Sequence, residues 1–329
     1  ANIFLSEKVF KRKQNWSSNE VETDNNYTSE IEEVVNEQRR LIAEEMMGYP
    51  YPNGQYNISA RSLIITTWRS GSTFLGDVLN SHPGNYYHYE PLLDYDIVQI
   101  RGEPLASGAI RNLKNLLTCN YTDMEFLNPF CRLFPFQSMK VVRMRLSLVE
   151  ELLEDPNLGV RVVLLVRDPR GTLQSRKHRD WCPGNPDCFE AVRLCADLVA
   201  DYNNEAVRYE DLSVEPHKGV QDLFQFFGLD FHPNIQLFLD THTKVNVGGV
   251  SSTYRNSKSA PFHWRQDLTF SEVRAIQRAC APAMYYWGYR RAANSSHQKE
   301  FNPLERKVLE FDSRVDIVKQ DVIVYFSIM

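Results

Sequence analysis

One short segment combines the residue types needed to bind a negatively charged group. It holds a guanidinium, three hydroxyls and a glycine, in the order Arg69, Ser70, Gly71, Ser72, Thr73. If a helix begins here, its first N–H groups lack intrahelical partners and carry partial positive charge. A phosphate or sulfate placed at this point would meet backbone donors as well as the side chains. The segment therefore predicts an anion-binding cradle.

The sequence on either side predicts a strand that leads into a helix. Residues 63–65 form a short apolar run that suits a buried parallel strand, and apolar residues from Leu75 onward follow the spacing of an amphipathic helix. The segment is not a Walker A loop, because it has one glycine and no lysine. An ordinary strand-to-helix turn, capped by Ser70 or Ser72, is the alternative interpretation.

A second segment places positive charge at the end of another predicted strand. Residues 161–167 are apolar apart from their terminal arginines, and Pro169 and Gly171 break the strand before a predicted helix over 172–177. Its cationic and hydroxyl side chains are Arg167, Arg170, Ser175, Arg176 and Lys177. Because the whole chain carries a net charge of −5, this cluster is not an effect of composition. Solvated surface charge is the alternative, but two such strand ends suit one ligand with two separated anionic groups.

Both segments resemble motifs of the Golgi carbohydrate sulfotransferases. T-T-W-R-S-G-S-T-F-L (66–75) is similar to their 5′-phosphosulfate loop, and V-R-D-P-R-G-x-L-x-S-R (166–176) is similar to their 3′-phosphate motif. Further similar motifs follow in the expected order, namely H-Y-E-P (88–91), V-R-Y-E-D-L (207–212), Y-R-N-S (254–257), H-W-R (263–265) and A-C-A-P-A-M-Y-Y-W-G-Y (279–289). The resemblance covers about residues 61–290. It is closest to the branch that sulfates galactose, N-acetylglucosamine or N-acetylgalactosamine, usually at the 6-hydroxyl.

The resemblance implies a fold, a co-substrate and a set of binding residues. The expected fold is α/β, with a central parallel sheet flanked by helices in the P-loop NTPase-like sulfotransferase arrangement. The expected sulfuryl donor is 3′-phosphoadenosine-5′-phosphosulfate (PAPS), released as adenosine 3′,5′-bisphosphate (PAP), with no metal and with a glycan or proteoglycan as acceptor. The residues that match the 5′-phosphosulfate loop are Arg69, Ser70, Gly71, Ser72 and Thr73. Arg167 and Ser175 match the 3′-phosphate site, and Arg255 would close over the nucleotide unless it is an ordinary surface arginine.

Sulfuryl transfer needs few groups beyond these. The acceptor hydroxyl must lie in line with the breaking S–O bond, a base must take its proton, and the leaving phosphate must be stabilised. Arg69 and the N–H groups of its loop suit the last task. Glu90 is the candidate base, because Pro91 favours an extended backbone that could direct the carboxylate into the cleft. The alternatives are a structural carboxylate paired with an arginine such as Arg143, and His88 as the base.

Composition limits the class of protein. The chain has 329 residues, 43% of them hydrophobic, and can bury one substantial core. Its net charge of −5 argues against a general nucleic-acid binder, and no run reaches the ~18–20 apolar residues of a membrane-spanning helix. Members of the resembled family are type II Golgi membrane proteins. The resemblance therefore implies a Golgi lumenal enzyme whose anchor is absent from this chain, while the oligomeric state is not predicted.

Sequons and cysteines support a lumenal location independently. Sequons for N-glycosylation occur at Asn15, Asn26, Asn57, Asn120 and Asn294. The six cysteines allow fifteen sets of pairs. The favoured set pairs Cys119 with Cys131, Cys182 with Cys188 and Cys195 with Cys280. Reduced buried thiols are the alternative.

Three regions are predicted along the chain. Residues 1–60 form a lumenal stem and an N-terminal helix, with the stem over 1–29 and the helix over 30–47. Residues 61–291 form the sulfotransferase domain, and 292–329 form a tail of unknown role. Within the domain, residues 92–138 carry few regular signals and are expected to shape the acceptor pocket.

Some residues and functions stay open. Trp68, Trp264 and Tyr254 could stack on adenine or a sugar, although packing is the favoured role. Residues 209–211 are expected to be structural. One alternative function is a P-loop kinase that uses ATP, supported only by Asp168 after an apolar strand. Another is a catalytically inactive glycan-binding relative, favoured by the short segment near 201–209 and by the tail.

Overall fold

The computed structural model describes residues 24–49, 60–122, 124–202, 206–249 and 252–305. The side chains of residues 24–28 are not described. The predicted tail beyond residue 305, the segment 203–205, most of the predicted stem and the sequons at Asn15 and Asn57 therefore lie outside what the structure describes. The backbone of Asn26 lies in a described helix, but its side chain is not described.

The described residues contain one sheet of five parallel strands in the order β2-β3-β1-β4-β5. The strands are β1 (Ala60–Ile65), β2 (Asn85–His88), β3 (Phe136–Val141), β4 (Val160–Val166) and β5 (Ala206–Arg208). In the central strand β1, Leu63 lies opposite Met139 of β3 and Val162 of β4. The chain leaves β1 toward one edge of the sheet and crosses later to the other edge. The loop after β1 therefore lies at a switch point of the topology, where ligands of open α/β sheets bind.

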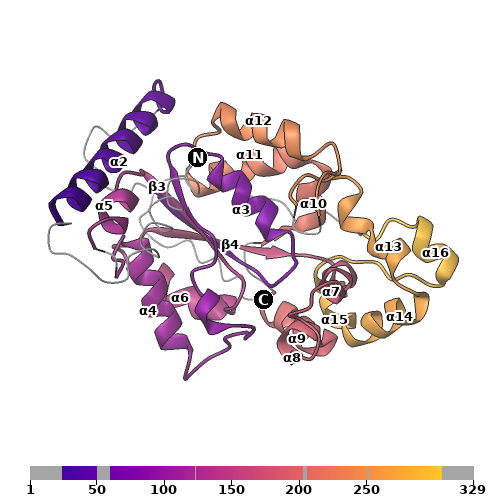
Figure 1. The fold of residues 1–329 in the computed structure, drawn as a ribbon. Coiled ribbons are helices and arrows are strands. Elements are labelled where there is room, and N and C mark those ends of the chain that lie inside the picture. Colours follow the sequence, from indigo (N-terminus) through magenta and orange to yellow (C-terminus); the bar gives the residue numbers. More distant parts are fainter. Residues whose placement is uncertain (1–23, 50–59, 123, 203–205, 250–251, 306–329) are drawn as a thin grey trace.

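Helices surround this sheet. The α-helices are α2 (Asp24–Glu45), α3 (Ser72–Asn80), α4 (Ala106–Leu117), α5 (Leu127–Cys131), α6 (Glu150–Leu153), α7 (Pro169–Lys177), α8 (Pro186–Phe189), α9 (Ala191–Ala200), α10 (Tyr209–Val214), α11 (Pro216–Phe227), α12 (Pro233–His242), α13 (Trp264–Asp267), α14 (Phe270–Ala279), α15 (Ala281–Tyr286) and α16 (Ser295–Glu300). Short 3₁₀ turns are η2 (Leu93–Tyr95), η3 (Leu146–Val149) and η4 (Ala260–Phe262). Figure 1 shows the helices on both sides of the sheet.

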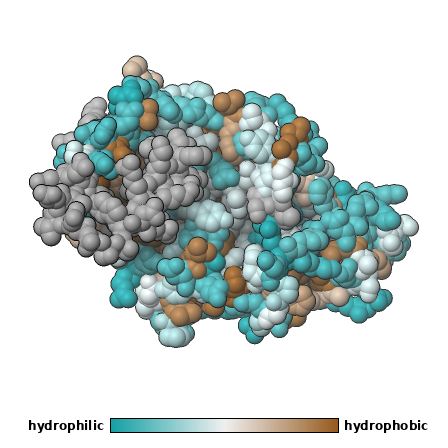
Figure 2. Space-filling view, in the orientation of Figure 1, coloured by the Kyte–Doolittle hydropathy of each residue, from teal (hydrophilic) through white to brown (hydrophobic). Residues whose placement is uncertain are grey.

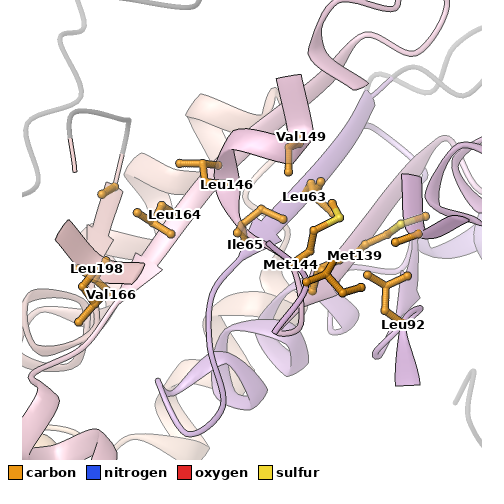
Figure 3. Packing of buried hydrophobic residues seen from close by; sticks show 14 of the residues in the cluster. Leu63, Ile65, Leu92, Met139, Met144, Leu146, Val149, Leu164, Val166 and Leu198 are labelled. Atoms are coloured by element: carbon orange, nitrogen blue, oxygen red, sulfur yellow. The ribbon is translucent and has the colours of Figure 1, made fainter. Parts of the chain in front are cut away.

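Two hydrophobic clusters lie on opposite faces of the sheet, because alternate residues of a strand point to opposite sides. Leu63 and Ile65 belong to the cluster covered by α4, α6, α9 and α15, part of which is shown in Figure 3. Ile64 belongs to the cluster covered by α2, α3, α11 and α12. This layered arrangement confirms the predicted α/β fold with a central parallel sheet.

Local sequence signals account for several helix ends. Thr269 and Glu272 form a reciprocal capping box at the start of α14. Gly228 ends α11 with φ of 70°, a left-handed conformation that glycine adopts without a Cβ clash. The helix predicted over 172–177 is confirmed as α7, which begins at Pro169.

Three local predictions need correction. The stem predicted over residues 1–29 is wrong for 24–29, because α2 already begins at Asp24. The apolar pair between Lys140 and Arg143 predicts a strand over 140–143, whereas β3 spans Phe136–Val141 and begins four residues earlier. The region 92–138 contains α4, whose buried stripe includes Ala109 and Leu113. Its buried residues follow the spacing of an amphipathic helix, so this helix was visible in the sequence and was overlooked.

Both flanking regions pack on the central unit. Ile31, Val35 and Ile42 of α2 are buried in the same cluster as Leu75 of α3. At the other end, Leu304 forms an antiparallel bridge with Tyr289. The division into a domain at 61–291 with separate flanks stays a prediction.

The three predicted disulfides are present. Cys119 pairs with Cys131, Cys182 with Cys188 and Cys195 with Cys280. All six cysteines of the chain are therefore oxidised. Two of the pairs could be predicted because each closes a short loop, and the third pair consists of the two remaining cysteines.

Removing Cys195–Cys280 is expected to cost more stability than removing Cys182–Cys188. The first bridge closes a sequence separation of 85 residues and the second one of 6. Chain entropy then predicts losses of about 4–5 and about 2 kcal/mol in the free energy of unfolding. Urea unfolding of the two double-alanine variants measures both losses. Equal losses would show that native contacts, rather than loop length, determine the stabilisation.

The surface is largely hydrophilic on the face seen in Figure 2, where apolar residues form small separate groups. Among the described ranges, no helix combines the length and the apolar character that crossing a membrane requires.

Candidate active site

The loop between β1 and α3 adopts a tight left-handed turn. Arg69 has φ of 65° and Gly71, at the N-cap of α3, has φ of 90°. A Cβ at Gly71 would lie 2.2 Å from the Tyr209 ring, so both the backbone angle and the space require glycine. The N-cap Gly71 has no side chain that could cap α3, so the first N–H groups of this helix can donate to an anion.

Hydroxyl groups hold this loop in place. Ser70 is fully buried, and its Oγ lies 2.5 Å from Thr66 Oγ1 and donates to Thr67 O at 2.8 Å. Thr66 Oγ1 donates to Leu165 O, which ties the loop to β4. Ser70 therefore fixes the turn in this structure. Ser72 is also buried, at the first turn of α3.

The structure brings the two predicted anion-binding segments together. Arg69 Nε donates to Ser175 Oγ at 3.0 Å, and Arg167 Nη1 donates to Arg69 O at 2.8 Å. Burial, together with the charges of Arg179 and Arg167, lowers the pKa of Arg69 to about 10. A binding anion would relieve this repulsion between neighbouring guanidinium groups.

Arg167 has a donor available for a ligand. Its Nε is buried and has no hydrogen-bond partner among the described residues, while its guanidinium lies 4.8 Å from the Tyr209 ring centroid. A buried unpaired N–H is costly unless a ligand or water satisfies it. The open N–H groups at α3, Arg69 and the unpaired Arg167 Nε thus fit a ligand with two anionic groups, as PAPS has.

The other cations of the second segment serve the fold. Arg170 is fully buried and pairs with Asp168 at 2.7 Å. Arg176 donates to Trp68 O, Cys188 O and Thr67 Oγ1. Lys177 pairs with Glu272 near the surface. The expected basic cluster is therefore reduced to Arg167, which with Ser175 faces Arg69.

Glu90 lies in a nearly buried group of charges. Lys140 Nζ donates to Glu90 Oε1 at 2.9 Å, and Arg143 Nη1 donates to Glu90 Oε2. The Glu90 side chain keeps 12% of its surface exposed, compared with 1% for Lys140. The Arg143 guanidinium also lies 5.8 Å from the ring of Trp68, which directly precedes Arg69. The pairing with Arg143 that the sequence left open is present, and Lys140 is an additional partner.

His88 lies in the core. Burial lowers its pKa to about 3, and its ring stacks on Tyr121 at 5.7 Å and contacts Tyr86. Its Nδ1 lies 2.8 Å from the Tyr121 hydroxyl. These contacts give His88 a packing role.

Arg255 is bound to its own loop. Its guanidinium donates to the carbonyls of Tyr254 and Gly249, and Arg255 N donates to His242 O. Tyr254 packs against His242 in a tilted arrangement, with ring centroids 3.7 Å apart, and is 38% exposed. Arg255 would have to leave these carbonyls to reach a nucleotide, so its role over the nucleotide stays a prediction.

Packing was the favoured role for Trp68 and Trp264, and the structure confirms it. Trp68 and Trp264 are 5% and 1% exposed, so both rings pack in the interior. Trp264 lies against the Arg170 guanidinium at 4.1 Å.

Two residues near the site have contacts that the sequence did not indicate. Tyr209, which was expected to be structural, packs its ring over Gly71 and beside Arg167. Lys140 had no assigned role and lies buried beside Glu90. A lysine inside an otherwise apolar strand was the available signal, because a buried ammonium needs a charged partner.

Glu210 connects the start of α7 to Tyr289, behind the second anion-binding segment. It is fully buried, accepting from Asp168 N at 3.0 Å through Oε1 and from the Tyr289 hydroxyl at 2.8 Å through Oε2. Burial, together with the charge of Asp168, raises the pKa of Glu210 from 4.5 to about 7.

Glu210→Gln is expected to make stability less dependent on pH. Below pH 4.5 the carboxyl is protonated in both the folded and the unfolded chain. Between pH 4.5 and about 7 only the unfolded chain ionises, so the native protein loses stability as pH rises, by up to about 3 kcal/mol. Glutamine keeps the shape without this titration. Unfolding measured at pH 5 and pH 8 for both proteins tests this, and identical pH slopes would contradict it.

Comparison with known proteins agrees with this geometry. Residues 59–288 match the family model described as "Sulfotransferase domain". The chain is 25% identical to mouse carbohydrate sulfotransferase 5 over 328 residues, covering 73% of this chain and 83% of that protein. It is 26% identical to mouse carbohydrate sulfotransferase 1 over 360 residues, covering 80% and 87%. The structure of mouse sulfotransferase SULT7A1 complexed with PAP matches at 12% identity and a TM-score of 0.42, over 75% of this chain and 91% of that one, a similarity on which no argument rests.

The family model spans well over half of the chain, from before β1 to the end of the last recognised motif. The family predicted from the motifs is confirmed: this chain is a sulfotransferase and belongs to the sulfotransferase domain family.

Proposed function

We propose that the protein transfers a sulfuryl group from PAPS to the 6-hydroxyl of a galactose, N-acetylglucosamine or N-acetylgalactosamine residue in a glycan or proteoglycan chain. The observation that carries the proposal is the contact between Arg69 and Ser175, which makes one site of the two anion-binding segments. The carbohydrate acceptor is supported by the relatives, which are carbohydrate sulfotransferases.

Different side chains would bind the two anionic ends of the nucleotide. PAPS supplies a sulfuryl group attached to a phosphate leaving group. Arg69, Ser72, Thr73 and the N–H groups at Ser70, Gly71 and the start of α3 would hold the 5′-phosphosulfate, and Arg69 would stabilise the charge that develops on the leaving phosphate. Arg167 and Ser175 would hold the 3′-phosphate, with Arg255 reaching over the nucleotide from its loop.

Glu90 would take the proton from the acceptor hydroxyl. In the structure both of its oxygens accept from cations, Lys140 on one and Arg143 on the other. An incoming hydroxyl must therefore share an oxygen with one of these donors. A carboxylate oxygen has two lone pairs, so Glu90 can accept from the hydroxyl without losing either cation.

The disulfides support a lumenal site of action. Three disulfides and no free cysteine are typical of proteins that fold in an oxidising compartment. Together with the relatives, this favours the Golgi lumen.

A single assay tests the proposal. Purified protein is incubated with ³⁵S-labelled PAPS or with ³²P-labelled ATP and a panel of glycans, and the products are mapped for the sugar and the hydroxyl modified. Label transfer from PAPS to a 6-hydroxyl supports the proposal. Phosphorylation from ATP would favour a kinase, although Asp168 is buried against Arg170 and caps α7. Glycan binding without any transfer would favour an inactive relative.

A further inference from the structure

Tyr89 is an exposed aromatic residue held between the candidate base and the donor loop. It directly precedes Glu90 and is 54% exposed, whereas its neighbour His88 is buried in the core. Most exposed aromatic side chains are free to change rotamer. Fixed contacts hold Tyr89 instead.

One face of the Tyr89 ring is covered by Lys140. The ammonium lies 3.8 Å from the ring centroid and at the same time donates to Glu90 Oε1 at 2.9 Å. A cation over an aromatic face is attracted by the negative charge of the π system, and burial of Lys140 strengthens that attraction. The ring position is therefore coupled to the position of the Glu90 carboxylate.

The polar end of the ring faces the donor loop. The Tyr89 hydroxyl lies near the side chain of Thr73 in the predicted phosphosulfate loop. Since the ring face toward Lys140 is taken, the exposed area must belong largely to the opposite face and its edge. This surface lies between the group that would accept a proton and the loop that would hold the sulfuryl donor.

We propose that the open face of Tyr89 is the platform on which the acceptor pyranose stacks. The inference rests on the proposed function and adds to it a residue that selects a sugar ring as substrate. The C–H groups on one face of a pyranose are apolar and slightly positive, so they match the face of an aromatic ring, while the sugar hydroxyls stay free for hydrogen bonds. A ring stacked there would lie beside both Glu90 and Thr73.

Three variants test the platform. Tyr89→Ala removes the ring, Tyr89→Phe keeps the ring and removes the hydroxyl, and Tyr285→Ala removes a ring that is 75% exposed on α15. Tyr89→Ala is expected to raise KM for the glycan about tenfold, while the affinity for PAP changes less than about twofold. Tyr89→Phe and Tyr285→Ala are expected to keep KM for the glycan near the wild-type value. Melting temperatures identify any variant that does not fold.

A second measurement is independent of turnover. Saturation-transfer NMR on the complex with PAP and an oligosaccharide acceptor should place ring protons of one sugar against the wild-type protein, and Tyr89→Ala should lose that pattern. An unchanged KM and an unchanged pattern in Tyr89→Ala would overturn the platform while leaving sulfuryl transfer intact. A weakened PAP affinity with an unchanged glycan KM would overturn it too, by assigning Tyr89 to the nucleotide site through Thr73. If the wild-type protein transfers sulfate to no glycan, the proposed function fails and the platform fails with it.

Discussion

Replacing Arg69 with alanine is expected to lower kcat for sulfuryl transfer about a thousandfold. Arg69 supplies the only cationic side chain of its loop and contacts Ser175 of the second segment. Removing one preorganised donor that faces developing charge typically costs two to three orders of magnitude, about 10²–10³ in rate. The variant should also bind PAP more weakly, because its guanidinium would no longer pair with phosphate.

Two further variants test whether the loss of activity depends on the guanidinium of Arg69. Arg69→Lys keeps the charge but loses the planar fork, so it should recover only part of the activity. Arg274→Ala removes an exposed arginine on α14 and should leave kcat unchanged. Steady-state kinetics with labelled PAPS, and calorimetric titration with PAP, give both quantities. An Arg69→Ala enzyme with wild-type kcat would refute the predicted role of the loop.

Glu90→Gln is expected to lower kcat by about 10²–10⁴, the usual contribution of a general base. PAP affinity should stay near the wild-type value, since Glu90 contacts Lys140 and Arg143 rather than the anion-binding loop. The substitution also leaves two nearly buried cations without their carboxylate. A loss of about 3–5 kcal/mol in stability is therefore expected as well.

A double variant distinguishes the two possible roles of Glu90, as the catalytic base or as a structural ion-pair partner. Glu90→Gln with Lys140→Met removes one cation together with the carboxylate and restores the charge balance that Glu90→Gln alone disturbs. If Glu90 is the base, the double variant regains stability but stays inactive. If it recovers activity along with stability, Glu90 acts only as an ion-pair partner. Urea unfolding and kcat measured on the same preparations decide between the two.

The residues whose chemistry is local could be predicted from the sequence. The loop around Gly71 and the helix that follows β4 each depend on neighbours within a few positions, although α7 begins at Pro169 rather than at residue 172. The meeting of Arg69 with Ser175 was also foreseen, because the carboxyl ends of parallel strands share one edge of a sheet.

Other contacts between distant segments could not be read from the sequence. Arg143 was one of the alternatives for a partner of Glu90, but Lys140 meets Glu90 across fifty residues and no local pattern encodes that pairing. The Tyr209 ring covers Gly71 only because β5 brings α10 back to the first loop. Arg170 and Arg176 looked like ligand contacts for the same reason: their charge is visible in the sequence, but their buried partners are not.

The disulfide between Cys182 and Cys188 is connected, through Arg176, to the loop that carries Arg69. Arg176 holds the carbonyl of Cys188 with one nitrogen and reaches Trp68 and Thr67, just ahead of Arg69, with the others. Without that bridge the loop that carries the Cys188 carbonyl would no longer be closed by a covalent bond. Reduction of Cys182–Cys188 is therefore expected to loosen the support that Arg176 gives to the backbone just ahead of Arg69.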